Sequence, residues 1–103
     1  MQAAWNALVD RNRRAVLDAL AESELSVNEL VERLGMTQPQ TSKHLRVLRE
    51  AGLVRVERDG PRRLYRVEPR PMAEIDAWLA PYRRLWNRSL DRLGEQLRKD
   101  EEG

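Results

Sequence analysis

The spacing of apolar residues predicts that the first half of the chain folds into short amphipathic helices. Apolar side chains recur there at three- and four-residue steps, which places them on one face of each helix. Asp10 is a suitable cap for the second helix, and Gly35 and Gly52 stand where the third and fourth helices should end. The expected helices cover residues 3–9, 11–21, 27–34 and 38–51.

The third and fourth helices have the form of a helix-turn-helix. Ser26 with Glu29, and Thr37 with Gln40, have the spacing of a capping box, in which two side chains satisfy free backbone N–H groups at a helix start. Because only a short turn at Gly35 separates the two helices, the second is predicted to be a recognition helix that lies in the major groove of DNA.

A β-hairpin is predicted to follow. Residues 54–58 and 64–67 alternate apolar and polar side chains, and the turn-forming residues 59–61 lie between them. A hairpin after a helix-turn-helix predicts a wing, whose basic tip meets the DNA backbone or the minor groove; the alternative is an ordinary solvated hairpin. The arginines of the expected tip are Arg58, Arg62 and Arg63.

The rest of the chain predicts one long helix over residues 72–99, after a break at Pro69 and Pro71. Pro81 should kink this helix or divide it. A helix of about 28 residues measures about 42 Å, whereas a domain of this size is about 26 Å across. A second copy of the chain is therefore expected to bury the apolar side chains that one small core cannot cover.

The first helix is expected to join this dimer interface. The alternative is that the aromatic residues complete the core of a monomer. The predicted interface residues are Trp5, Leu8, Trp78, Leu79, Tyr82, Leu85, Trp86, Leu90 and Leu93.

The net charge of +2 is unevenly distributed along the chain. Residues 33–66 carry nine basic and three acidic side chains, a net charge of +6, whereas residues 1–32 carry −3 and residues 67–103 carry −1. The positive charge therefore coincides with the helix-turn-helix and the hairpin, as expected for a surface that binds phosphates.

A helical wheel separates two faces of the recognition helix, with Thr41, Leu45 and Leu48 on the buried arc. We expect phosphate contacts from Arg46 and the tip arginines, and base contacts from the start of the helix. The predicted base-contacting residues are Gln38, Gln40, Ser42 and Lys43, with Thr41 at the margin.

His44 is the single histidine of the chain. It flanks the apolar arc, so a half-buried structural histidine with its hydrogen bonds satisfied is the preferred interpretation, and a DNA contact is the alternative. One histidine without cysteines makes no metal site unless several carboxylates join it, and no spacing here provides them. No pattern typical of a catalytic nucleophile or a phosphate-binding loop occurs, so we expect neither an enzyme nor a cofactor.

At 103 residues the chain suffices for one domain, and 41% hydrophobic with 35% charged residues fits a modest core with a charged exterior. The absence of Cys excludes disulfides, and no apolar stretch suits a membrane span or a signal peptide. We expect a cytoplasmic protein with a single domain over residues 1–103. The helix-turn-helix and wing should occupy residues 10–68, with dimerisation helices over 1–9 and 71–99.

The segment from Arg11 to Val67 resembles the ArsR/SmtB family of winged-helix bacterial repressors. The most specific part is the run QPQTSKHLRVLREAGLV, from Gln38 to Val54, and the run LSVNEL that begins at Leu25 also matches. The resemblance implies an operator-binding homodimer that pairs through its first and last helices and represses transcription, often at its own promoter.

Metal-sensing members of that family have a Cys-Val-Cys motif where this chain has Ser26-Val27-Asn28. Their second metal site uses His on the last helix, and this last helix contains none. The resemblance is therefore to the metal-independent branch, and it implies no particular inducer.

Together these expectations describe an α+β, mostly α, winged helix-turn-helix of order α-α-α-α-β-β-α with a long C-terminal dimerisation helix. The predicted function is a sequence-specific regulator, a homodimeric repressor that binds double-stranded DNA at an inverted repeat. The alternative is a winged-helix protein-interaction module that binds no DNA. The residues alone do not distinguish a repressor from an activator.

Overall fold

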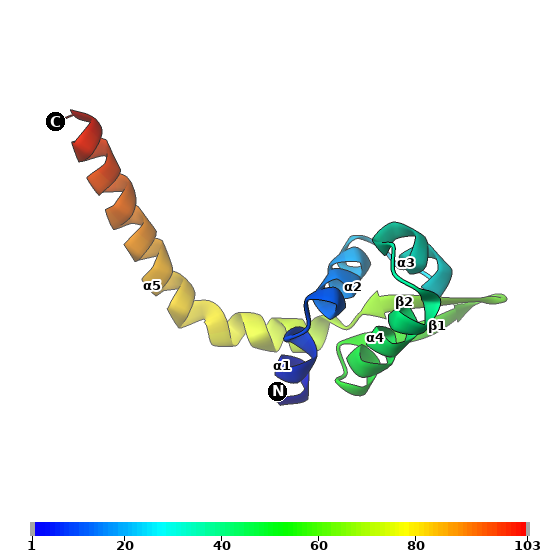
Figure 1. Cartoon of the computed structure of the whole chain (residues 1–103). Coiled ribbons are helices and arrows are strands. Elements are labelled where there is room, and N and C mark those ends of the chain that lie inside the picture. The colour runs from blue at the N-terminus through cyan, green and yellow to red at the C-terminus, as the bar shows by residue number, and fades with distance from the viewer. Residues whose placement is uncertain (1, 103) are drawn as a thin grey trace. The chain divides into compact units, whose positions relative to one another are not determined.

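Within residues 2–102, which the computed structural model describes, the chain forms five helices and a two-stranded antiparallel sheet (Figure 1). The described chain divides into two compact units, one that ends at Met72 and one that begins at Ala73. The order of helices and strands along the chain confirms the predicted winged helix-turn-helix. The elements are α1 (Gln2–Leu8), α2 (Arg11–Glu22), α3 (Val27–Leu34), α4 (Gln38–Glu50), β1 (Val54–Asp59), β2 (Arg62–Val67) and α5 (Pro69–Glu102).

The end of α1 and the start of α2 satisfy each other's free backbone groups. Asp10 caps α2 by accepting a hydrogen bond from the Arg13 N–H at 3.0 Å. In return, the guanidinium groups of Arg13 and Arg14 donate to the carbonyls of residues 6–9 at 2.8 to 3.3 Å. Basic side chains near a helix end can replace the missing intrahelical donors, so α1 ends without a glycine.

Both predicted capping boxes form. The Ser26 hydroxyl accepts from the Glu29 N–H at 3.2 Å, and the Ser26 N–H donates to the Glu29 carboxylate at 3.1 Å. Thr37 and Gln40 make the same reciprocal pair at 3.3 and 3.2 Å. Gly35 ends α3 at a φ of 68°, a conformation that a side chain disfavours, and its N–H donates to the Val31 carbonyl at 3.0 Å. Hydrogen bonds between residues close in sequence therefore stabilise both helix starts and the turn of the helix-turn-helix.

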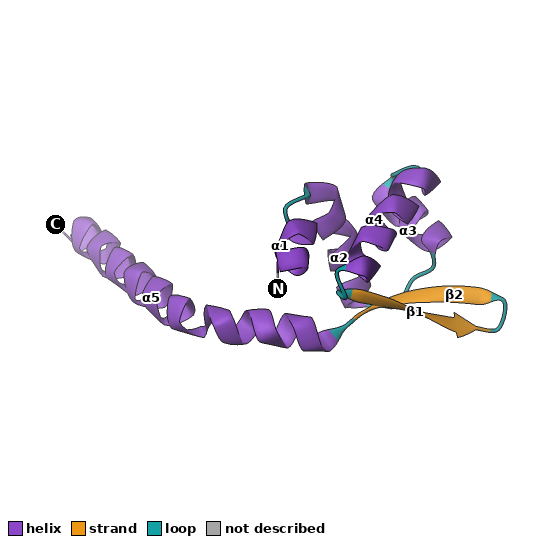
Figure 2. Ribbon diagram, turned by 90° about the horizontal axis from the view of Figure 1, so that it is seen from below, coloured by secondary structure: helices purple, strands orange, loops and turns teal. Residues whose placement is uncertain are grey.

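The two strands form the predicted wing. Val54 pairs with Val67 and Val56 with Tyr65, so these four residues share one face, whereas Leu64, opposite Glu57, lies on the other. β2 begins at Arg62 rather than at residue 64, because only residues 60 and 61 are needed for the turn. Figure 2 shows the hairpin extending beyond the helices of the first unit.

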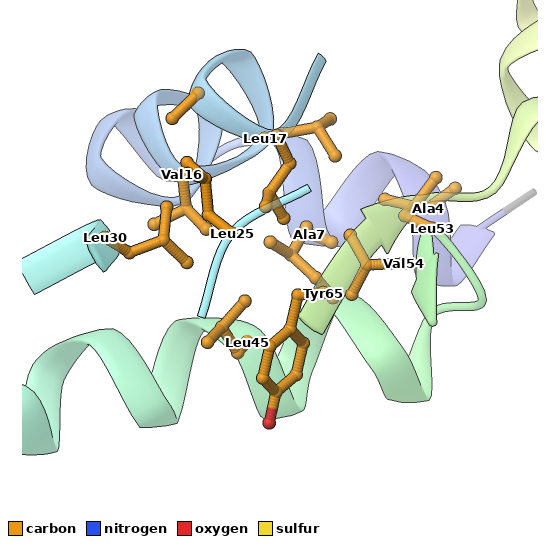
Figure 3. Packing of buried hydrophobic residues seen from close by; sticks show 13 residues of the cluster. Ala4, Ala7, Val16, Leu17, Leu25, Leu30, Leu45, Leu53, Val54 and Tyr65 are labelled. Atoms are coloured by element: carbon orange, nitrogen blue, oxygen red, sulfur yellow. The ribbon is translucent and has the colours of Figure 1, made fainter. Parts of the chain in front are cut away.

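The core of the first unit is one cluster of buried side chains from its helices and strands (Figure 3). Leu30 of α3 and Leu45 and Leu48 of α4 are at most 1% exposed. Burying a leucine stabilises a fold by roughly 1.5–3 kcal/mol. Apolar packing therefore sets the position of α4 against α3 and leaves the opposite face of α4 to solvent.

α5 has 34 residues and is longer than predicted. The prediction that Pro69 and Pro71 break the chain before this helix is wrong. Both prolines lie in its first turn, where a missing N–H leaves no intrahelical bond unmade. Pro81 lies inside the helix, and the ribbon bends in its yellow part, near residue 80 on the colour bar (Figure 1). The structure thus has a bent helix rather than a divided one. No helix among the described residues has the length and apolar character that a bilayer crossing requires.

Candidate nucleic-acid interface

The two faces of α4 agree with the predicted wheel. Thr41, Leu45 and Leu48 are its buried residues, and His44 and Val47 are half-buried beside them. The exposed residues of α4 are Gln38, Pro39, Gln40, Ser42, Lys43, Arg46, Arg49 and Glu50. The helix thus presents to solvent a polar face in which cations outnumber carboxylates.

The cations of this face are not neutralised within the chain. Among residues 2–102, Lys43, Arg46 and Arg49 form no ion pair. Each is three residues from the next, a spacing at which side chains on a helix are neighbours and like charges repel. This arrangement favours an anionic ligand, which would relieve the repulsion.

Arg49 is absent from the predicted site. On a wheel of about 100° per residue it lies next to Ser42, and it precedes the end of α4 by one residue. The periodicity that identified Ser42 therefore also indicated Arg49.

Two residues predicted at the start of the recognition helix have structural roles. Thr41 is 0% exposed and its hydroxyl donates to the Thr37 carbonyl at 2.9 Å. This burial corrects the prediction that Thr41 makes a marginal base contact. The Gln40 side-chain oxygen accepts from the Thr37 N–H. Bidentate recognition of adenine uses both the oxygen and the NH₂ of an amide, so the cap engages the Gln40 oxygen and leaves its NH₂ group free.

Gln38, Ser42 and Lys43 keep their exposed polar groups at the start of α4. His44 lies at the edge of this surface, half-buried, and its Nδ1 has no hydrogen-bond partner among the described residues. The half-burial agrees with the preferred interpretation of His44, whereas the unpartnered Nδ1 does not agree with a satisfied histidine.

The arginines at the wing tip fall into two groups. Arg58 and Arg63 lie directly opposite each other, are exposed and form no ion pair within residues 2–102. Like charges directly opposite each other destabilise an antiparallel pair. Arg62 lies opposite Asp59, and its guanidinium donates to the Glu29 carboxylate. The uncompensated charge of the tip is therefore that of Arg58 and Arg63.

At the base of the wing, Arg55 and Arg66 also lie opposite each other, but carboxylates neutralise them. Glu57 pairs with both arginines at 3.1 Å. Arg55 also lies 3.1 Å from Glu68, in an ion pair without hydrogen-bond geometry, and Arg66 lies 3.1 Å from Glu24. Among the cations of α4 and the wing, those without an ion pair within residues 2–102 are thus Lys43, Arg46 and Arg49 on α4 and Arg58 and Arg63 at the tip.

Glu29 connects the helix-turn-helix to the wing. The backbone N–H of Ser26, then its hydroxyl and the Arg62 guanidinium, lower the pKa of Glu29 below its ordinary value. The carboxylate therefore stays charged at neutral pH, where it binds both the start of α3 and the wing. Glu29 and Arg62 are 33 residues apart, so no local sequence pattern indicated this contact.

A second candidate surface is the apolar side of α5. Seven of its large apolar residues are exposed, by fractions from 43% for Trp86 to 61% for Leu90, whereas Ile75 is only 9% exposed. The rings of Trp78 and Tyr82 stack in a tilted geometry, with centroids 4.9 Å apart. On α1, Trp5 and Leu8 are half-buried, and Leu8 packs against the core. The remaining predicted interface residues of α5 are Leu79, which is half-buried, and Leu85 and Leu93, which are exposed.

The sequence is similar to those of bacterial transcription regulators. Residues 10–56 match the family described as "Bacterial regulatory protein, arsR family". The chain is 38% identical over 100 residues to the HTH-type transcriptional regulator Rv2034 of Mycobacterium tuberculosis, covering 97% of this chain and 89% of that protein. It is 43% identical over 63 residues to the HTH-type transcriptional repressor SmtB of the same species, covering 61% of this chain and 47% of that repressor, about half its length.

The fold is similar to that of a solved regulator domain, the homodimeric winged helix-turn-helix DNA-binding domain of Mb0332 from Mycobacterium bovis, described as a possible ArsR-family transcriptional regulator. The TM-score is 0.67 at 30% identity, covering 79% of this chain and 75% of that one. The likeness confirms the winged helix-turn-helix fold. Given this fold, the matched segment and a relative that is similar along nearly the whole chain, the protein belongs to the arsR family of bacterial regulatory proteins.

Proposed function

We propose that this protein is a homodimeric repressor that binds double-stranded DNA in a sequence-specific way, at an inverted-repeat operator. The observation that carries the proposal is the uneven neutralisation of its cations. Arg55 and Arg66 at the wing base are bound by carboxylates, whereas Lys43 and Arg46 on α4 form no ion pair among the described residues. Unpaired cations on an exposed helix suit the phosphates of a nucleic acid.

In this proposal α4 enters the major groove by its first turns. Gln38, Ser42 and Lys43 contact base edges, where lysine favours guanine acceptors and glutamine favours adenine. Phosphate contacts come from Arg46 and Arg49 on α4 and from the wing tip, and they set the position of α4 in the groove. Gln40 contributes through the NH₂ group that its cap leaves free.

The dimer forms through the helices at the two ends of the chain, residues 1–9 and 71–99, while residues 10–68 bind DNA. Contiguous exposed apolar surface marks interaction sites, and α5 carries such a surface. From Trp86 onward, Leu90, Leu93 and Leu97 follow at steps of four, three and four residues, the seam of a coiled coil. Two copies related by a twofold axis would place their α4 helices at half-sites about 34–36 Å apart.

The similarity to a relative that is named a repressor supports the proposal of repression rather than activation. Any regulation of this protein does not use cysteine thiolates, since the chain contains no Cys. As a DNA-binding regulator of a bacterial family, the protein is proposed to act in the cytoplasm.

Selection of bound duplexes from a random pool tests the proposed function and gives the half-site spacing. A gel shift at fixed salt on the selected operator then compares Lys43→Ala/Arg46→Ala with Arg98→Ala, a change on the exposed surface of α5. We expect the double variant to lose about tenfold or more in affinity and the control to bind as the wild type. Unchanged affinity of the double variant would refute the docking face. No binding to any duplex at low salt would favour the protein-interaction module.

A further inference from the structure

We propose that Glu29 is a positioning residue that fixes the wing by binding Arg62, and that the wing contacts phosphate through Arg58 and Arg63 rather than through Arg62. The inference rests on the DNA-binding function proposed above, but the Glu29–Arg62 contact can also be tested without DNA. It separates three neighbouring arginines of one hairpin into an anchor and two DNA ligands.

The contact begins from a carboxylate that the helix start already holds. Glu29 Oε1 accepts from the Ser26 N–H at 3.1 Å, and the same oxygen accepts from Arg62 Nη2. An exposed ion pair usually contributes little, because ordering two long side chains costs entropy. Here the capping box has already ordered the Glu29 side chain, so only the Arg62 side chain remains to be ordered.

The Glu29–Arg62 contact is the last of three that join β2 to the segment around the start of α3. Glu24 pairs with Arg66 at 3.1 Å. Leu25 and Tyr65 exchange both backbone hydrogen bonds, at 3.2 and 2.8 Å. From the base of the wing to its tip, the contacts thus run through residues 66, 65 and 62 of β2. The Arg62 contact is the one nearest the turn, where a hairpin is otherwise free to move.

The strand geometry separates Arg62 from the other two tip arginines. Successive side chains of a strand point to opposite faces, so Arg62 and Arg63 lie on different faces of the hairpin. Arg58 is directly opposite Arg63 and shares its face. A phosphate bound by Arg58 and Arg63 therefore lies on the face away from Arg62.

Charge favours the same assignment. Arg62 is bound by Glu29 and lies opposite Asp59. A phosphate that took Arg62 would break the existing pair and leave the Glu29 carboxylate beside another anion. Arg58 and Arg63 repel each other until an anion binds, so a phosphate there relieves a cost already present in the free protein.

The salt dependence of operator binding distinguishes the anchor from the DNA ligands. The slope of log K against log salt concentration is negative, and each lost phosphate contact reduces its steepness by about 0.9, so a dimer that loses one contact in each wing changes by about 1.8. We expect this change for Arg63→Ala and no change in slope for Arg62→Ala. Glu29→Gln keeps a residue that can close a capping box and releases Arg62, so its slope should stay the same or steepen. If Arg62→Ala reduces the steepness of the slope as much as Arg63→Ala does, the assignment of Arg62 as an anchor is overturned.

Amide hydrogen exchange tests the anchor in the free protein. We expect Glu29→Gln and Arg62→Ala to accelerate exchange of the β2 amides several-fold, and the double variant to add nothing to either. Glu32→Gln is the matched control, because Glu32 lies exposed on the same helix and forms no ion pair within residues 2–102. Exchange in Glu29→Gln equal to that of the wild type would remove the positioning role. If the wing exchanges as expected while the wild type binds no DNA, the anchor stands and the proposed function fails.

Discussion

α4 and α5 are both amphipathic helices, but their apolar faces have opposite environments. Leu45 and Leu48 of α4 are at most 1% exposed, whereas Leu90 and Leu93 of α5 are 61% and 54% exposed. Their polar faces do not differ in the same way. On α5 Arg83 is bound to Asp76, but the other cations of that helix, like those of α4, form no ion pair among the described residues.

The comparison shows what helical periodicity predicts and what it does not. The same three- and four-residue spacing identifies an apolar face in both helices, because it depends only on the pitch of the helix. It does not reveal whether the chain itself covers that face. α4 is covered from within its own unit, and its free surface is the polar one. In α5 most large apolar residues are exposed, so the two helices leave opposite faces exposed to solvent.

Leucine-to-alanine substitutions in the two helices should differ most in their effect on the free energy of unfolding. Leu45→Ala opens a cavity in the core and should lower the free energy of unfolding by about 2–5 kcal/mol. Leu90→Ala removes an exposed side chain and should change it by no more than about 0.5 kcal/mol at protein concentrations too low for dimerisation. Urea unfolding followed by circular dichroism measures both. Equal losses would contradict the assignment of α5 to an external partner.

Trp86→Glu tests whether the exposed apolar face of α5 forms the dimer interface. Placing a charge in the proposed interface should weaken dimerisation at least about thirtyfold, because a central aromatic residue typically contributes 2 kcal/mol or more to an interface. The stability of the first unit should stay as in the wild type. Sedimentation equilibrium measures the dimer.

Arg84→Glu is the matched control, since this exposed residue lies on the opposite side of α5 from Trp86 on a helical wheel. It should leave the dimer unchanged. A wild-type protein that sediments as a monomer at all concentrations would remove the basis of the comparison, because the apolar face of α5 would then have no partner copy.

Much of the fold could be predicted because its determinants are local. The capping boxes at Ser26 and Thr37 form as their spacing indicated, and the buried arc of α4 consists of the three residues predicted. The errors also have local causes. The prolines at 69 and 71 predict a break, but both lie in the first turn of α5, where proline is well tolerated.

The candidate site was less predictable where it depends on contacts across the fold. Which arginines face a carboxylate is decided by packing between segments that are distant in sequence. Arg58, Arg62 and Arg63 are equivalent in a sequence pattern, but only Arg62 lies within reach of Glu29. Gln40 could be assigned to two roles, and the structure places its oxygen in the cap.

The smallest expected effect is the loss of stability in acid. It distinguishes the cap of α4 from the caps of α2 and α3. The pKa of Asp10 is lowered chiefly by the backbone N–H of Arg13, and that of Glu29 chiefly by the backbone N–H of Ser26. α4 is capped by Thr37 and Gln40, which do not titrate. Only the caps of α2 and α3 should therefore respond to pH.

A lowered pKa means that the folded state binds fewer protons than the unfolded state in the acid range. The stability that these carboxylates contribute is therefore fully present above their ordinary pKa values of 3.8 and 4.5, and it is lost as the pH falls through the lower values of the folded state. We expect the midpoint of thermal unfolding to be constant from pH 7 to about pH 5 and to fall below that. Asp10→Asn/Glu29→Gln keeps side chains that can cap and should flatten the fall, whereas Thr37→Ala should lower the midpoint equally at every pH. An acid response of the double variant as steep as that of the wild type would show that other carboxylates control it, and that the supporting helices are no more acid-sensitive than α4 itself.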